Sequence, residues 1–97
     1  MSEAFIRGGT EQVINRVKVS YTAWNSYLGF HKDCEFRMYH LAMALRGLVA
    51  KKMSDSSPYW IAVYGDLRYV FVVRRRNGIP TSFHYGDFLL TNVEEKH

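Results

Sequence analysis

The chain has 97 residues and a formal net charge of +4, which is the size of one domain with a single modest core. Its composition, 47% hydrophobic and 23% charged, is that of an ordinary globular protein, and no apolar run approaches the roughly 18 residues that a membrane span needs. The single cysteine, Cys34, excludes an internal disulfide, and residues 1–9 contain no apolar segment of a secretory signal. Both features predict a cytoplasmic protein.

The N-terminal part of the chain is predicted to form a helix over residues 10–29. Residues 1–9 are weakly specified and are expected to be poorly ordered or to add an edge strand. Thr10 suits the N-cap position and Gly29 suits the helix end. Apolar residues between them recur every three or four positions, which predicts one apolar stripe; they are Val13, Ile14, Val17, Tyr21, Trp24 and Leu28.

A second helix is predicted over residues 33–53, with Asp33 as its N-cap. Its apolar positions are separated alternately by four and three residues, as in a coiled-coil seam; they are Cys34, Met38, Leu41, Leu45 and Leu48. The short connection between the two helices predicts an antiparallel αα-hairpin.

Residues 59–93 are predicted to form an antiparallel β-meander of three to four strands, because runs of β-branched and aromatic residues alternate with turn sequences. Gly65-Asp66 suits a two-residue type II′ turn and Asn77-Gly78 a type I′ turn. These turns place Tyr64 opposite Leu67 and Arg76 opposite Ile79. Residues 88–93 are expected to add the short fourth strand, and residues 94–97 to form a polar tail.

The predicted fold class is therefore α+β, a single two-layer domain over residues 1–97 with the αα-hairpin on one face of the meander. The register sorts the strand residues onto two faces, and both are apolar. The aliphatic face, expected to be the core, carries Tyr59, Ile61, Val63, Val70, Val72, Phe83 and Tyr85, with Arg68 and Arg74 at its ends. The aromatic face, expected to stay uncovered, carries Trp60, Ala62, Tyr64, Leu67, Tyr69, Phe71, Val73 and His84.

Positive charge is concentrated in the middle of the chain, where eleven Lys or Arg and only four Asp or Glu lie between Arg16 and Arg76. Such a surface favours polyanions, although an acidic protein surface is an equally good target. The expected binding residues join the aromatic face to the basic hairpin tip; they are Trp60, Tyr64, Tyr69, Phe71, Arg74, Arg75, Arg76 and His84. The alternative interpretation is that the basic tip only protects a sheet edge from aggregation.

No residue pattern predicts a cofactor or a metal site, because one cysteine and scattered histidines form no ligand motif. His84 is interpreted as an interface histidine in preference to a general acid or base. Paired carboxylates at active-site spacing and a phosphate-binding glycine loop are both absent from the sequence. These absences favour a non-enzymatic protein over an enzyme, and the enzyme interpretation is kept as the alternative.

Residues 61–73, which contain a Gly-Asp turn followed by Arg68 at the start of a strand, resemble the strand pair of the RelE/ParE toxin superfamily. The resemblance implies a ribosome-dependent messenger RNase or a gyrase poison that an antitoxin neutralises. Arg68, Arg74, His84 and Tyr85 would then be the catalytic candidates.

The preferred hypothesis is a small non-enzymatic binding protein, an inhibitor of the kind that phages or mobile elements direct at host defence. Its partner is expected to be a protein of a nucleic-acid-handling complex, nucleic acid itself, or both, bound through the basic and aromatic sheet surface. A homodimer through the aromatic sheet face is a further expectation. No membrane partner is predicted.

Overall fold

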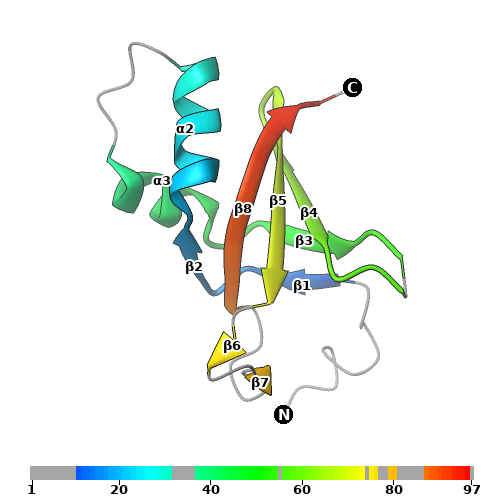
Figure 1. The fold of residues 1–97 in the computed structure, drawn as a ribbon. Helices are drawn as coiled ribbons and strands as arrows, with labels where there is room; N and C mark the ends of the chain where they lie inside the picture. The colour runs from blue at the N-terminus through cyan, green and yellow to red at the C-terminus, as the bar shows by residue number, and fades with distance from the viewer. Residues whose placement is uncertain are drawn as a thin grey trace.

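The computed structural model describes residues 11–31, 37–54, 56–73, 75–76, 79–80 and 87–96. The chain is mixed α and β, with a curled six-stranded sheet and two helices (Figure 1). In chain order the elements are β1 (Glu11–Val13), β2 (Arg16–Val19), α2 (Tyr21–Phe30), α3 (Met38–Leu45), β3 (Val49–Lys52), β4 (Trp60–Tyr64), β5 (Leu67–Val73), β6 (Arg75–Arg76), β7 (Ile79–Pro80) and β8 (Asp87–Glu95). Within these ranges neither helix is long and apolar enough to cross a membrane.

The strand order in the main sheet is β1-β3-β4-β5-β8-β2, so the first two strands of the chain form its two edges. Only Ile14 and Asn15 join these edge strands, and the sheet must therefore curl until its edges approach each other at one end. Figure 1 shows β1 and β3 turned across the far side of β8 and β5. Two backbone hydrogen bonds fix the junction, because Ile14 N–H donates to Leu48 O and Gly47 N–H donates to Ile14 O, both at 2.8 Å.

The prediction of one helix over residues 10–29 is wrong in its first half, which forms β1 and β2. The segment is rich in β-branched residues, and Arg16 to Val19 alternates polar with apolar, which suits a strand. Helix α2 begins only after Ser20, whose hydroxyl accepts a hydrogen bond from Ala23 N–H at 3.1 Å. The helix continues past Gly29 to Phe30.

The second predicted helix, over residues 33–53, is also too long. Helix α3 ends at Leu45, and Gly47 follows with φ +90°, a left-handed conformation that favours glycine. The chain then forms β3, which pairs with both β1 and β4. Helix α2 packs on β8 and α3 packs on β2, so the antiparallel αα-hairpin is not confirmed. Asp33 and Cys34 lie outside the described residues.

The β4–β5 hairpin is confirmed in its predicted register, with Tyr64 opposite Leu67 and Gly65 at φ +64° in the turn. The predicted pairing of Arg76 with Ile79 is also confirmed, within the separate β6–β7 pair. The third strand of the meander is not confirmed, because all of β5 pairs with β8, and residues 81–85 lie outside the described residues. Strand β8 takes the place of the predicted strand 88–93 and includes the first two residues of the predicted polar tail.

Strand β8 lies inside the sheet, antiparallel to β5 on one side and parallel to β2 on the other. Helix α2 follows β2 and continues along β8, where Ser26 Oγ donates to Asn92 Oδ1 at 3.1 Å (Figure 1). On the side of β8 that faces away from β5, strand β2 pairs with the first half, and helix α2 lies along the second half. An extra residue in β8, Thr91, makes a β-bulge opposite Val70 and Phe71, and its hydroxyl donates to Val70 O at 3.1 Å.

The core lies between the helices and the inner face of the sheet, which we define as the face that carries Trp60, Tyr69 and Phe71. These three side chains are 4%, 2% and 0% exposed, and they form one buried cluster with residues of both helices. The remaining members include Ile14, Val19, Ala23, Tyr27, Leu41, Leu45, Ala50, Phe88, Leu90 and Val93. The predicted assignment of the two faces is thus inverted, since the aromatic face is the core.

Candidate functional site

The aromatic face cannot be the binding surface in the folded chain, because its large side chains are buried by the protein itself. The physical reason is area: Trp, Tyr and Phe remove more apolar surface from water than Val or Ile, so covering their face is more favourable. Phe88 fills the centre, with ring centroids 5.5 Å from Trp60 and 5.6 Å from Phe71. The expectation of binding or dimerisation through Trp60, Tyr69 and Phe71 is therefore corrected.

Tyr69 illustrates how strongly this inner face excludes solvent. Burial raises the pKa of Tyr69 to about 12, with smaller contributions from Tyr27 and Tyr64. Tyr64, at the end of β4, differs from the other aromatic residues of this face because it is 54% exposed. It is the one predicted aromatic binding residue that the described structure leaves at the surface.

The predicted basic hairpin tip and His84 are only partly among the described residues. Arg75 and Arg76 form β6, and Arg74, His84 and Tyr85 lie outside the described residues. Their proposed roles stay predictions.

The open side of the sheet is its outer face, which we define by five aliphatic side chains in the middle of the sheet. Val63 is 46% exposed, and the other four are half-buried; the set is Ile61, Val63, Val70, Val72 and Leu89. The register places them together, since Ile61 pairs with Val70 and Val72 pairs with Leu89. Both described helices contribute their buried residues to the inner-face cluster, so no described helix covers the outer face.

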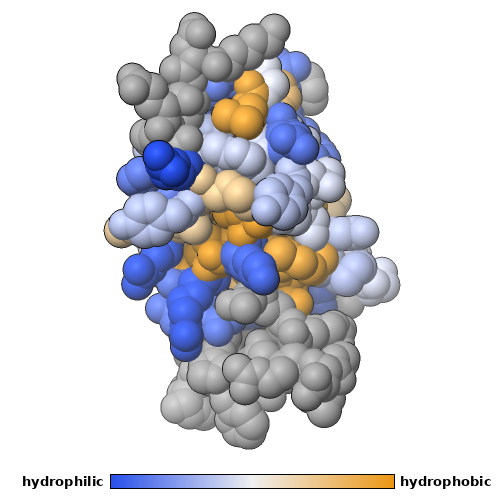
Figure 2. Space-filling view, turned by 60° about the vertical axis from the view of Figure 1, so that its left-hand side comes forward, coloured by the Kyte–Doolittle hydropathy of each residue, from blue (hydrophilic) through white to orange (hydrophobic). Residues whose placement is uncertain are grey.

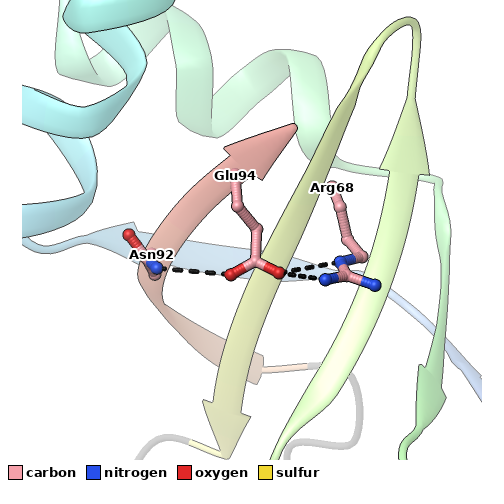
Figure 3. Close-up of polar contacts among 3 residues, drawn as sticks. All are labelled: Arg68, Asn92 and Glu94. Carbon is pink, nitrogen blue, oxygen red and sulfur yellow. Dashed lines mark hydrogen bonds and ion pairs between the residues drawn. The ribbon is translucent and has the colours of Figure 1, made fainter. Parts of the chain in front are cut away.

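A polar network lies on this outer face at the start of β5 (Figure 3). Arg68 stands opposite Glu94 on the neighbouring strand, and its Nε and Nη2 both donate to Glu94 Oε2, the Nε bond at 2.9 Å. Asn92 Nδ2 donates to Glu94 Oε1 at 3.5 Å and Asn92 Oδ1 accepts from Ser26. The network therefore links α2, β8 and β5 and holds the Arg68 guanidinium against the sheet.

Two further ion pairs join neighbouring strands of the main sheet. Lys51 Nζ lies 3.7 Å from Glu11 Oε2, between β3 and β1, and Arg16 Nε lies 3.6 Å from Asp87 Oδ1, between β2 and β8. The Lys51–Glu11 pair is exposed, and such pairs contribute about 0–1 kcal/mol, whereas the Asp87 carboxylate is buried. Their importance here is that most of the charge on this face is locally compensated, which leaves an aliphatic centre between paired ions.

Apolar surface also reaches the side of the molecule that carries β2 and the helices. Figure 2 brings this side forward and shows hydrophobic side chains gathered in its lower half, with hydrophilic side chains around them. Leu89 lies on the outer face opposite Lys18, whereas half-buried Val17 lies opposite Phe88 on the inner face and packs against the core. The hydrophobic side chains on this side are bordered by polar groups, as protein interfaces are.

Sequence reasoning missed the outer face because it assigned these aliphatic residues to the core. It also placed Glu94 in a tail, so the partner of Arg68 was not predicted. The available signal was the difference in side-chain size between the two faces, which indicates the face that gains more from being covered.

Arg68, the one described candidate of the toxin-like alternative, is engaged by Glu94. Among the described residues no three His, Cys, Asp or Glu side chains are grouped to hold a metal ion.

Comparison with known proteins supplies no assignment, since no family model, curated protein or solved structure matches this chain.

Proposed function

We propose that this chain is a small non-enzymatic binding protein, and that its outer sheet face docks a protein of a nucleic-acid-handling complex. The observation that carries the proposal is the aliphatic centre of that face, which no described helix covers. A solvated face of an antiparallel sheet normally presents polar residues. Here Ile61, Val70 and Val72 stand on adjacent strands in their place, and a contiguous apolar patch of this kind marks an interaction surface.

The charge distribution supports a protein as the occupant of this face. Three ion pairs between neighbouring strands, which include Arg68–Glu94 and Lys51–Glu11, leave few uncompensated cations to meet phosphates. A protein partner with an apolar patch would pack on the aliphatic centre, and the paired ions would form the polar rim of the interface.

The proposed action is inhibition by occupancy. A sheet face is rigid, because every strand is held by its neighbours, and a rigid surface loses little conformational entropy on binding. A chain of 97 residues that covers a working surface of a nucleic-acid enzyme would block it without chemistry of its own. This is the form of inhibitor that phages and mobile elements would direct at host defence.

The test is capture of partners from a bacterial lysate treated with nuclease, followed by reconstitution with the purified partner. Val63→Glu and Val70→Glu place a charge in the aliphatic centre and should each abolish capture while far-UV circular dichroism stays unchanged. Asn25→Glu, on an exposed position of α2, adds the same charge away from the face and should bind normally. Unimpaired binding by both valine variants contradicts the proposal, as does binding that is lost on nuclease treatment.

A further inference from the structure

The exposed side of α3 presents a second surface with different chemistry from the sheet. Leu41 and Leu45 turn inward and are 1% and 0% exposed, whereas Tyr39 is 63% exposed. Tyr39 and Met43 are four residues apart and share one side of α3, and Arg46, the C-cap residue three positions later, continues this stripe just past the helix. We define the α3 surface as this stripe together with Arg37, the exposed residue that precedes the helix.

No described carboxylate compensates the positive charge around this surface. The described residues from Gln12 to Ser54 include no Asp or Glu, and the carboxylates of the described ion pairs come from β1 and β8. Arg37 and Arg46 form no ion pair with any described carboxylate, in contrast to Arg68 on the outer sheet face. The two surfaces therefore differ in kind, one apolar with paired ions and one cationic.

Arg46 is held in an orientation that suits an anion. Its Nε–H donates to Asn15 O at 3.0 Å, which ties the side chain to the junction between β1 and β2. Its two terminal amino groups have no hydrogen-bond acceptor among the described residues. A planar guanidinium fixed at Nε and open at both terminal groups presents the paired donors that phosphate oxygens accept.

Tyr39 lies between the two arginines in the chain and offers an aromatic ring to solvent. Its ring centroid is 4.8 Å from that of His40, and His40 Nδ1 accepts a hydrogen bond from Arg37 N–H at 3.1 Å. These contacts hold the Tyr39 ring near the helix N-terminus. Arg37 and Arg46 are the N-cap and C-cap residues of α3, so they lie at the two ends of this eight-residue helix, which is roughly 12 Å long.

We propose that the α3 surface binds single-stranded nucleic acid, with phosphates on Arg37 and Arg46 and a base stacked on Tyr39. Cations flanking an exposed aromatic ring are the arrangement that single strands use, because their bases have accessible faces. A duplex offers phosphates but no free base face, and an acidic protein offers carboxylates but no base. This inference does not depend on the proposed function, since it concerns a different surface and a different class of ligand.

The test is fluorescence anisotropy with labelled oligo(dT) and oligo(U) of about 15 nucleotides, within the length that small single-strand sites span. Wild-type protein should bind at low salt, and log K should fall linearly with log salt, by about 0.7 for each phosphate contact. Arg46→Ala should lower that slope by about 0.7. Tyr39→Ala should weaken binding about 5- to 150-fold, and Tyr39→Phe, which keeps the ring, should restore it. The two oligonucleotides distinguish DNA from RNA as the natural ligand.

Lys96→Ala is the matched control, because it removes one exposed positive charge at the far end of β8 and should leave the affinity and slope nearly unchanged. Circular dichroism checks the fold of each variant. The proposal is overturned if wild-type protein does not bind either oligonucleotide at low salt, or if Arg46→Ala and Tyr39→Ala bind as wild type does. Equal competition by polyglutamate of matched charge, or tighter binding of a duplex that Tyr39→Ala leaves unaffected, overturns it in favour of a general polyanion site.

Discussion

Replacing Phe71 with alanine should remove a large part of the free energy of unfolding. Phe71 is 0% exposed in the middle of the inner face and contacts Phe88 ring to ring. Truncating a buried phenylalanine costs about 3–5 kcal/mol, and the lost aromatic pair lies within that range. A domain of this size has roughly 5–15 kcal/mol of stability in total. With a urea slope of about 1.5 kcal/mol per molar, the midpoint should fall by about 2–3 M.

The neighbouring residue supplies the control, because Val70 points to the outer face and is only half-buried. Val70→Ala should cost about 1 kcal/mol, chiefly through lower strand propensity, and should move the urea midpoint by less than about 1 M. Unfolding would be followed by tryptophan fluorescence and by far-UV circular dichroism, and coincident transitions would support two-state analysis. If Val70→Ala proves the more damaging of the two, the assignment of the inner face as the core is refuted.

Two further predictions concern single residues. The pKa of Tyr69 is about 12 in the folded chain, so between pH 10 and 12 the Tyr69 hydroxyl ionises only when the chain is unfolded. Its contribution to the free energy of unfolding is therefore intact below pH 10 and falls by about 2–3 kcal/mol as pH rises from 10 to 12. Urea titrations should show a smaller alkaline loss for Tyr69→Phe, and an equal loss would contradict the burial argument. Gly47→Ala should cost about 1–2 kcal/mol, because φ is +90° there, although no atom lies within 4 Å of the added methyl group. Gly29 lies in helix α2 and is equally open, so Gly29→Ala should stabilise the fold by about 0.5–1 kcal/mol. Thermal melts of the two variants measure both effects.

Local signals in the sequence predicted the local parts of the fold. The Gly65-Asp66 turn defined the β4–β5 register because a two-residue hairpin allows few alternatives, and Gly65 indeed has positive φ. The segment from Val13 to Val19 was misassigned because its apolar positions fit a helical stripe as well as an alternating strand. Its β-branched residues favoured the strand, and the pairing of β2 with a strand near the C-terminus decided the outcome.

The candidate site was harder to predict, because it depends on which side of the sheet the helices cover. Both faces of the β4–β5 hairpin are apolar, and alternation therefore could not distinguish the core from the surface. The position of β8 determines which face becomes the core. Phe88 pairs with Val73 and packs on Phe71 and Trp60, which completes the inner face. A pairing between strands so far apart in sequence leaves no local signal.

The parallel pairing of β2 with β8 also determines when this protein can fold. Arg16 is aligned with Asp87, which is 71 positions later in the chain, and β8 follows all the other described strands. During synthesis the aromatic side chains of β4 and β5 must therefore remain without Phe88 and Leu90 until β8 has been made. Contacts between residues so far apart in sequence slow folding and prolong the lifetime of aggregation-prone intermediates. Expression yield should consequently depend on chaperone supply and on temperature.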